Sequence, residues 1–438
     1  MVSRCLGISA CLLLLSGDDP LHPRGHDREG LPRSTVPFAV YAKDASHLLN
    51  RLHALLWIAE RSPVEVGASL PGELRRAKLE PKTFFRDKWY FGMRKGEQIL
   101  PEDQAVFGGD TRVSPVEDLR GELGKQVRAL LTPLATTTGV AALPELANPL
   151  ARLLLQWDLL AVWWRHEQSG NAEPETLALL AHCIAALAQS RATLEVLPSG
   201  LDSLRDAVKG SPSDRNAPYF PTGLLAKSAD SSWRELAREE KALFHATKSL
   251  RAARIFVSGK DGSITERIVR EAAAATDAAS MPKLPLGTEA ALVLSLVGLD
   301  ENLEPVATKV VDEIRIRTIT GPAELAPDNG SSRDGLSHWV FQRSRAQSLL
   351  GGAQPFRFVP DTAQSLFLEY GTPKHTTYYA QCALCHRQTN SGGQDPSGIK
   401  ALGRYAKPRV ETDPQARLRL AETQFAKIVA KLQARLAR

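Results

Sequence analysis

Apolar residues recur at helical spacing in the first half of the chain. Between residues 44 and 61, leucine and alanine side chains repeat three and four positions apart, which predicts an amphipathic helix that ends at Ser62-Pro63. A second helix is expected from Asn148-Pro149 to Ser169-Gly170, and a third from Pro174 to about Leu194. The N-terminal half is therefore predicted to be mostly helical.

The period changes to two in the middle of the chain. Within residues 306–320, Ile314 and Ile316 alternate with Arg315 and Arg317, as in a strand with one buried face. Runs at 254–257 and 289–297 also predict strands, and a turn is expected at 300–302. A polar helix is predicted over residues 232–250. We expect an antiparallel sheet that is covered on one face.

Breaker-rich stretches at 210–221 and 321–335 separate these regions, and no internal repeat is visible. A last helix is expected to begin near Asp413-Pro414 and to carry one apolar face. The predicted fold is α+β and predominantly α-helical. It comprises a helical domain at 38–210, a domain at 211–335 with the antiparallel β-structure, and a helical segment at 336–438.

The N-terminus predicts export. Arg4 precedes an apolar run from Leu6 to Leu15, followed by small and polar residues, which is typical of a secretory signal peptide over residues 1–17. The run is shorter than the roughly 20 residues of a membrane-spanning helix. Lipid attachment at Cys11 and a short buried start are the alternatives. Residues 18–37 are poor in apolar side chains and are expected to form a flexible linker.

Composition excludes several classes of protein. The chain has 438 residues, of which 43% are hydrophobic and 24% charged, so disorder throughout is excluded. Five cysteines are too few for a disulfide-rich protein of this length. A net charge of +6 is too small to indicate nucleic-acid binding. The common signatures of nucleotide binding, zinc proteolysis and serine hydrolysis are absent, and no catalytic residue is predicted.

One motif carries specific chemistry. Cys382, Cys385 and His386 form the sequence C-x-x-C-H, the pattern of covalent haem attachment. Two thiols on one helical turn add across the two vinyl groups of haem, and the following histidine binds the iron from the proximal side. The same residues could instead form an exported disulfide, bind zinc or have no chemical role. Zinc is disfavoured because a closed structural site needs four ligands and the chain has no second cysteine pair.

The surroundings of the motif resemble a class I cytochrome c. Tyr379, Cys382, Ala383, Cys385 and His386 match the attachment sequence of that family, a Gly-rich loop follows at 391–393, and a terminal helix comes last. The resemblance spans about residues 360–438 and implies one covalent haem c. It predicts Cys382, Cys385 and His386 as the haem-binding residues and His386 as the iron ligand.

The chain departs from that family at the distal side of the iron. The family uses a downstream methionine, but no methionine follows Met281 and no histidine follows His386. A sixth ligand would have to come from upstream, for example from His375, His338, Met281 or Met93. Otherwise the iron is five-coordinate.

The rest of the chain resembles a group of uncharacterised exported bacterial proteins. The residues that carry this resemblance are Leu155-Gln156-Trp157-Asp158-Leu159 and Leu286-Gly287-Thr288-Glu289-Ala290-Ala291-Leu292-Val293. The resemblance agrees with export and implies no activity. Adjacent His182 and Cys183 point about 100° apart on a helix, so Cys183 is expected to be a small buried residue.

These observations predict a periplasmic or secreted mono-haem electron carrier rather than an enzyme, without a transmembrane segment or a nucleic-acid partner. The alternatives are a non-catalytic exported interaction protein with a C-x-x-C disulfide, and a haem protein with an open sixth position. Residues 400–438 contain ten basic and three acidic residues, a net charge of +7. This charge predicts an acidic redox partner, while a solvated helix surface is the simpler explanation.

Overall fold

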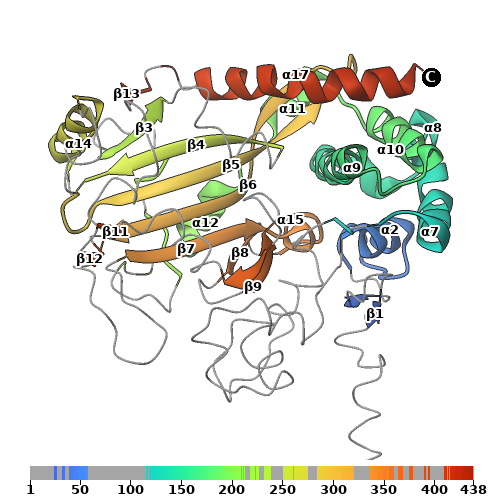
Figure 1. Cartoon of the computed structure of the whole chain (residues 1–438), viewed down its shortest axis with the longest axis horizontal. Coiled ribbons are helices and arrows are strands. Elements are labelled where there is room, and N and C mark those ends of the chain that lie inside the picture. The colour runs from blue at the N-terminus through green and yellow to red at the C-terminus, as the bar shows by residue number, and fades with distance from the viewer. Residues whose placement is uncertain are drawn as a thin grey trace, which may run out of the picture. The chain divides into compact units, whose positions relative to one another are not determined.

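The computed structural model divides the chain into two compact units (Figure 1). Unit 1 comprises residues 1–187, 349–351 and 364–375, and unit 2 comprises 188–348, 352–363 and 376–438. The expected boundary between residues 210 and 211 thus lies inside unit 2. The structure describes residues 24–26, 32–34, 39–57, 115–116, 118–208, 210, 212, 218–221, 223–225, 231–237, 250–259, 261–274, 284–319, 336–352, 354–359, 364–367, 374–377, 389–390, 393–394, 409–411, 413 and 415–437.

Unit 1 is built from helices, as the sequence predicts. Its α-helices are α2 (Leu48–Trp57), α7 (Gly121–Leu131), α8 (Thr137–Ala141), α9 (Pro149–Ser169) and α10 (Pro174–Ala186), with 3-10 turns η2 (Thr132–Leu134) and η3 (Pro144–Ala147). The predicted bounds of α9 are confirmed. The side chain of Asn148 accepts a hydrogen bond from Leu150 N at its start, and Gly170 ends it in the left-handed conformation.

The third predicted helix is shorter than expected. α10 ends at Ala186, and a separate helix, α11 (Arg191–Val196), begins after Ser190 in unit 2. The hydroxyl of Ser190 accepts a hydrogen bond from Thr193 N, which is a helix N-cap. Because the apolar spacing continues from α10 into α11, the sequence pattern shows no sign that a second helix begins after Ser190.

Residues 18–37 contain more structure than a flexible linker. Strands β1 (Arg24–His26) and β2 (Pro32–Ser34) pair antiparallel, with Gly25 opposite Arg33. Backbone hydrogen bonds make such a pair without apolar side chains, so composition did not predict it. The expected signal peptide at 1–17 lies outside the described residues.

Unit 2 contains a seven-stranded antiparallel sheet with the order β13-β3-β4-β5-β6-β7-β8. Its strands are β3 (Trp233–Ala237), β4 (Arg251–Ser258), β5 (Glu289–Leu299), β6 (Pro305–Ile319), β7 (Leu336–Arg343), β8 (Phe356–Val359) and β13 (Arg409–Val410). The three strands predicted in the middle of the chain are confirmed. So is the turn between β5 and β6, where Asp300 Oδ1 accepts hydrogen bonds from Asn302 N and Glu304 N.

Two predictions for this unit were wrong. The stretch expected to begin a polar helix at residue 232 forms β3, because Trp233 and Leu236 are buried on opposite faces of the sheet. Residues 336–359 were expected in a separate helical segment, but β7 and β8 belong to the same sheet as β4–β6. The α+β class is confirmed, while the described parts of 336–438 complete the sheet of the middle region.

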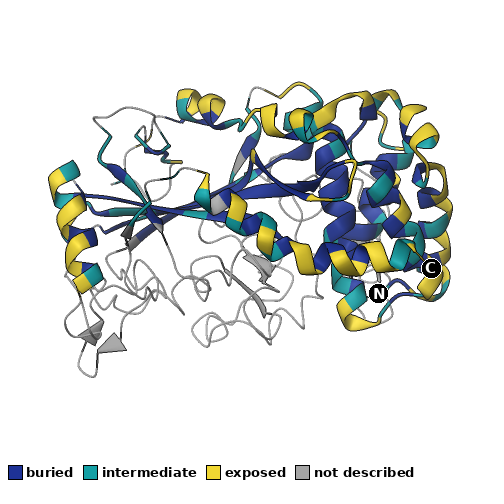
Figure 2. Ribbon diagram, turned by 90° about the horizontal axis from the view of Figure 1, so that it is seen from above, coloured by how far each residue is buried: buried dark blue, intermediate teal, exposed yellow. Residues whose placement is uncertain are grey.

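Both faces of the sheet are covered. On the face that we call the α14 face, Ile255, Leu292 and Leu294 pack with α14 (Gly262–Ala274) and with Leu420 of α17 (Ala416–Leu436). On the opposite, α12 face, the core combines α12 (Leu201–Ala207), residues 218–225 and the inward side chains of β4–β8. Figure 2 shows that the strands are buried along most of their length. The expected last helix is confirmed as α17, which contacts β4 and β6.

The packing around α12 leaves no room for a side chain at Gly200. It precedes α12 with φ of 79°, and a Cβ atom there would lie 2.7 Å from Arg343 Nη2 and 2.8 Å from Pro355 Cγ. Gly170 has φ of 70° but nothing within 4 Å of its Cβ position.

We predict that Gly200→Ala destabilises the protein more than Gly170→Ala. In both variants, backbone strain of an alanine at positive φ lowers the free energy of unfolding by about 1 kcal/mol. Gly200→Ala adds an overpacking penalty of about 1–3 kcal/mol. Urea unfolding followed by circular dichroism measures both. Equal losses would contradict the close contact of Gly200 with Arg343 and Pro355.

Candidate functional site

The haem-attachment motif itself, Cys382, Cys385 and His386, lies outside the described residues. The structure describes the backbone that follows it. Strands β11 (Thr389–Asn390) and β12 (Gly393–Gln394) pair antiparallel, which leaves two residues of the expected Gly-rich loop between them. Gly393, the last residue of the expected Gly-rich loop, thus lies in β12.

The segment that carries the motif joins the two edges of one sheet. The chain leaves the sheet after β8 at one edge and rejoins it at β13 on the opposite edge. Seven strands spaced about 4.8 Å apart place these edges roughly 30 Å from each other. Residues 360–408 are therefore anchored at both ends to unit 2.

A strip of polar side chains crosses β6 and β7 on the α14 face. We call it the polar strip: Glu313, Arg315, Arg317, His338 and Gln342. Because Leu292 is opposite Arg315 and Leu294 is opposite Glu313, these side chains share a face with the apolar core under α14. On β7, His338 is opposite Arg317 and Gln342 is opposite Glu313.

The burial of the polar strip shows that the sequence prediction of a sheet covered on only one face was wrong. Alternation of isoleucine with Arg315 and Arg317 predicts arginines on an uncovered face. Instead Arg315 is 6% exposed, His338 is 4% exposed, and Arg317 is half-buried. The sheet is therefore covered on both faces at β6.

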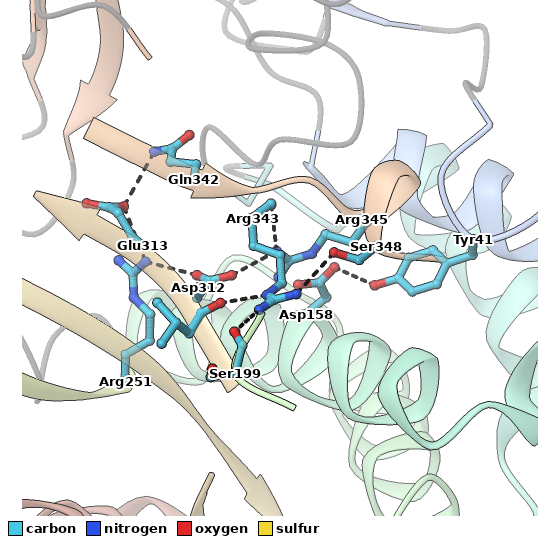
Figure 3. Close-up of polar contacts among 11 residues, drawn as sticks. Tyr41, Asp158, Ser199, Arg251, Asp312, Glu313, Gln342, Arg343, Arg345 and Ser348 are labelled. Carbon is cyan, nitrogen blue, oxygen red and sulfur yellow. Dashed lines mark hydrogen bonds and ion pairs between the residues drawn. The ribbon is translucent and has the colours of Figure 1, made fainter. Parts of the chain in front are cut away.

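A chain of alternating charges stabilises the buried carboxylates (Figure 3). Asp312 accepts from Arg345 Nη1 at 2.8 Å and from Arg251 Nη1 at 3.0 Å. Glu313 lies 3.3 Å from the same Arg251 nitrogen and also binds Arg315 Nε. Asp312 lies where the register between β5 and β6 shifts, so the irregularity presents two successive carboxylates to this chain.

The charge state of Glu313 follows from these contacts. Burial by itself would raise the pKa of its carboxyl group, but Arg315 and Arg251 outweigh burial and hold the pKa below its usual value. Gln342 Nε2 also donates to Glu313 Oε2 at 3.4 Å. Glu313 is therefore a carboxylate near neutral pH, and its stabilising contacts are lost as the pH falls and the group is protonated.

Arg343 is a buried cation with a structural role. Its Nε donates to Val311 O at 2.6 Å, another nitrogen donates to Ser199 O, and the guanidinium lies 4.8 Å from the ring of Phe356. Burial lowers the pKa of Arg343 to about 10, so it stays charged near neutral pH. It ties β6, β7 and the start of α12 together.

Of the four residues proposed as a sixth iron ligand, only His338 has a described side chain. Its imidazole is buried in the polar strip. Imidazole is a common axial ligand of haem iron, and guanidinium groups bind carboxylates of the kind that haem carries. No group of three or more metal-ligating side chains occurs among the described residues.

A second polar row crosses the α12 face, and the sequence analysis did not identify it. Ser258, Glu289, Thr318 and Ser337 lie opposite one another on four adjacent strands. Glu289 Oε1 accepts from Tyr219 OH at 2.8 Å and from Thr318 Oγ1 at 3.2 Å. Burial raises the pKa of Glu289. Only the register of four strands reveals this row, because its members are far apart in sequence.

In unit 1, the expectation for Cys183 is confirmed. The thiol is buried and donates to Leu131 O at 3.2 Å, while His182 is exposed. Burial raises the pKa of Cys183 to about 12, which makes the thiol unreactive. Asp158, from the Leu155–Leu159 stretch, accepts a 2.7 Å hydrogen bond from Tyr41 OH.

We predict that Glu313→Gln lowers the free energy of unfolding by about 3–5 kcal/mol, because it leaves Arg315 and Arg251 short of a buried carboxylate. The matched control is Glu266→Gln. Glu266 pairs with Arg234 at 3.0 Å but is 59% exposed, so its loss should be less than about 1 kcal/mol. Urea unfolding measures both, and a small effect of Glu313→Gln would show that the charge chain does not stabilise the sheet.

Comparison with known proteins adds no constraint on this site. No protein-family model matches the chain, no curated protein is significantly similar to it, and no solved structure matches it. The resemblances seen in the sequence therefore stay predictions, and the function has to be argued from the residues themselves.

Proposed function

We propose that the chain is an exported mono-haem c-type cytochrome-like protein that transfers single electrons. The observation that carries this proposal is the C-x-x-C-H motif, with Cys382 and Cys385 as attachment residues and His386 as iron ligand. A bound haem would supply one-electron redox chemistry. The chain supplies two thiols for covalent attachment and an imidazole for the iron.

The described structure supports this proposal indirectly. Both anchors of the motif-bearing segment, β8 and β13, belong to one sheet, so the segment is tied to a folded body. The same unit carries a buried imidazole and guanidinium groups in the polar strip.

Export belongs to the same proposal, because bacteria attach haem c outside the cytoplasm. It is supported by the apolar run at residues 6–15 after Arg4. Among the helices that the structure describes, none has the length and apolar character needed to cross a membrane.

We predict that the full chain, expressed in a host with cytochrome c maturation, carries one haem that denaturation does not release. The reduced protein should show the sharp α band of haem c. Cys382→Ala with Cys385→Ala should abolish covalent attachment, while Cys183→Ala, a buried thiol elsewhere, should leave it intact. A colourless product whose mass falls by two hydrogens on oxidation would favour the disulfide-containing interaction protein instead.

The redox partner is proposed to be acidic, because α17 presents basic side chains outward. Phe425, Ile428 and Leu432 are buried against the sheet, while Lys427 and Lys431 are exposed. The apolar side of α17 is buried, so its lysines lie on the side that a partner could contact. Steering by such a surface raises association rates and weakens with ionic strength.

We predict that Lys427→Glu with Lys431→Glu slows electron transfer to an acidic partner at low salt. The rates of variant and parent should converge at high salt, since the Debye length falls from about 30 Å at 0.01 M to about 10 Å at 0.1 M. Arg267→Glu with Arg270→Glu on α14 changes the net charge equally and is the control. Equal slowing by both pairs would show an effect of net charge rather than of α17.

A further inference from the structure

His166 is a buried histidine of unit 1 that the proposed function does not use. It lies in the last turn of α9, four residues before Gly170, and its side chain is 0% exposed. The backbone of Val116 and the backbone of Asn171 lie beside the imidazole. His166 therefore sits where the segment before α7 meets the chain that leaves α9.

Four residues of the segment before α7 form what we call the strap: Val116, Asp118, Leu119 and Arg120. Val116 N donates to Leu56 O of α2 at 2.8 Å, and Leu119 N donates to Asn171 O at 2.7 Å. Leu119 also pairs with Ala172 in a parallel bridge. Both apolar side chains of the strap are buried. The strap thus ties α2 to the chain that follows α9.

The charges around His166 do not compensate for its burial. Among the described residues, those that act on the imidazole are Arg165, on α9 itself, and Asp118, on the strap. Asp118 favours a protonated imidazole but already binds Arg120 through both carboxylate oxygens, at 2.8 and 2.9 Å. The C-terminal end of α9 and the neighbouring backbone also favour a cation. Burial and Arg165 outweigh these groups and lower the pKa of His166 to about 4.

Acid therefore acts on the closed strap through His166. When the strap opens, water reaches the imidazole and its pKa returns to the ordinary value of 6.5. The open state then binds a proton that the closed state takes up only near pH 4, so the stability of the closed state is full above pH 6.5 and is lost as the pH falls. The opening equilibrium changes by at most about 300-fold, and by about 20-fold between pH 7 and pH 5.

We propose that His166 is an acid-sensitive lock in unit 1 and that its protonation releases the strap from α2 and from the end of α9. The neutral imidazole fits the closed strap, whereas the protonated imidazole needs water that only the open strap admits. Opening uncovers Val116 and Leu119, so acid changes the apolar surface that unit 1 presents. This property goes beyond the proposed function because it needs neither haem nor a redox partner.

The test is hydrogen exchange of the full chain at pH 7 and pH 5, with rates corrected for the intrinsic effect of pH on exchange. The protection factors of the Val116 and Leu119 amides should fall by about 20-fold in the parent, because these amides exchange when the strap opens. In His166→Gln, which keeps a polar side chain that does not titrate, the fall should be less than about threefold. His166→Phe takes its place if that variant does not fold.

Two histidines of the same unit provide the controls. His182→Gln changes an exposed side chain on α10, and His53→Gln removes another buried imidazole, on α2. Both variants should keep the fall seen in the parent.

The outcomes decide the proposal. If the strap of the parent keeps its protection at pH 5, or if the non-titrating variants of His166 lose as much protection as the parent, the acid-sensitive lock is overturned. If His53→Gln abolishes the fall while His166→Gln retains it, His53 is the titrating group and the assignment to His166 is wrong.

Discussion

Pairing of buried charges along β6 is the interaction on which unit 2 depends. Two successive carboxylates, Asp312 and Glu313, sit where the register between β5 and β6 shifts, and both contact Arg251 of β4. A carboxylate in a protein interior is tolerated only with such partners. The pairing therefore links strands that are not neighbours, since β5 lies between β4 and β6.

This constraint also makes the register of the sheet specific. A shift of β6 by one residue would bring Ile314 to the polar strip and would turn Glu313 and Arg315 into the apolar core of the α12 face. Both faces would then lose their matching partners. The irregularity at Asp312 and the charges around it thus select one alignment among those that backbone hydrogen bonding alone permits.

The sequence predicted those parts of the fold that are coded locally. α9 could be located because Asn148, Pro149 and Gly170 mark its ends, and β5 and β6 because apolar residues alternate over long runs. β3 was missed because it has only five residues in a polar stretch and gains its burial from β4. β7 and β8 were assigned to another domain because strand pairing across a long connection leaves no local signal.

The candidate site likewise has one part that is contiguous in the sequence and one part that only the fold brings together. A C-x-x-C-H motif is contiguous and can be read directly, whereas the charge chain joins residues as far apart as Arg251 and Asp312. The sequence offered His338 only as one of four candidates for a sixth ligand, and its burial beside Arg317 emerges from the pairing of β6 with β7. Tertiary register, not composition, brings these groups together.

The order of β13 and α17 after the other strands of the sheet affects when unit 2 can fold. β13 completes the edge at β3, and α17 contacts β4 and β6, all of which are synthesised much earlier. Until β13 and α17 are made, the edge of β3 and part of the α14 face lack their cover, and both are surfaces prone to aggregation. The sheet of unit 2 is therefore completed late, while α7 to α10 of unit 1 come from neighbouring segments and can assemble earlier during synthesis.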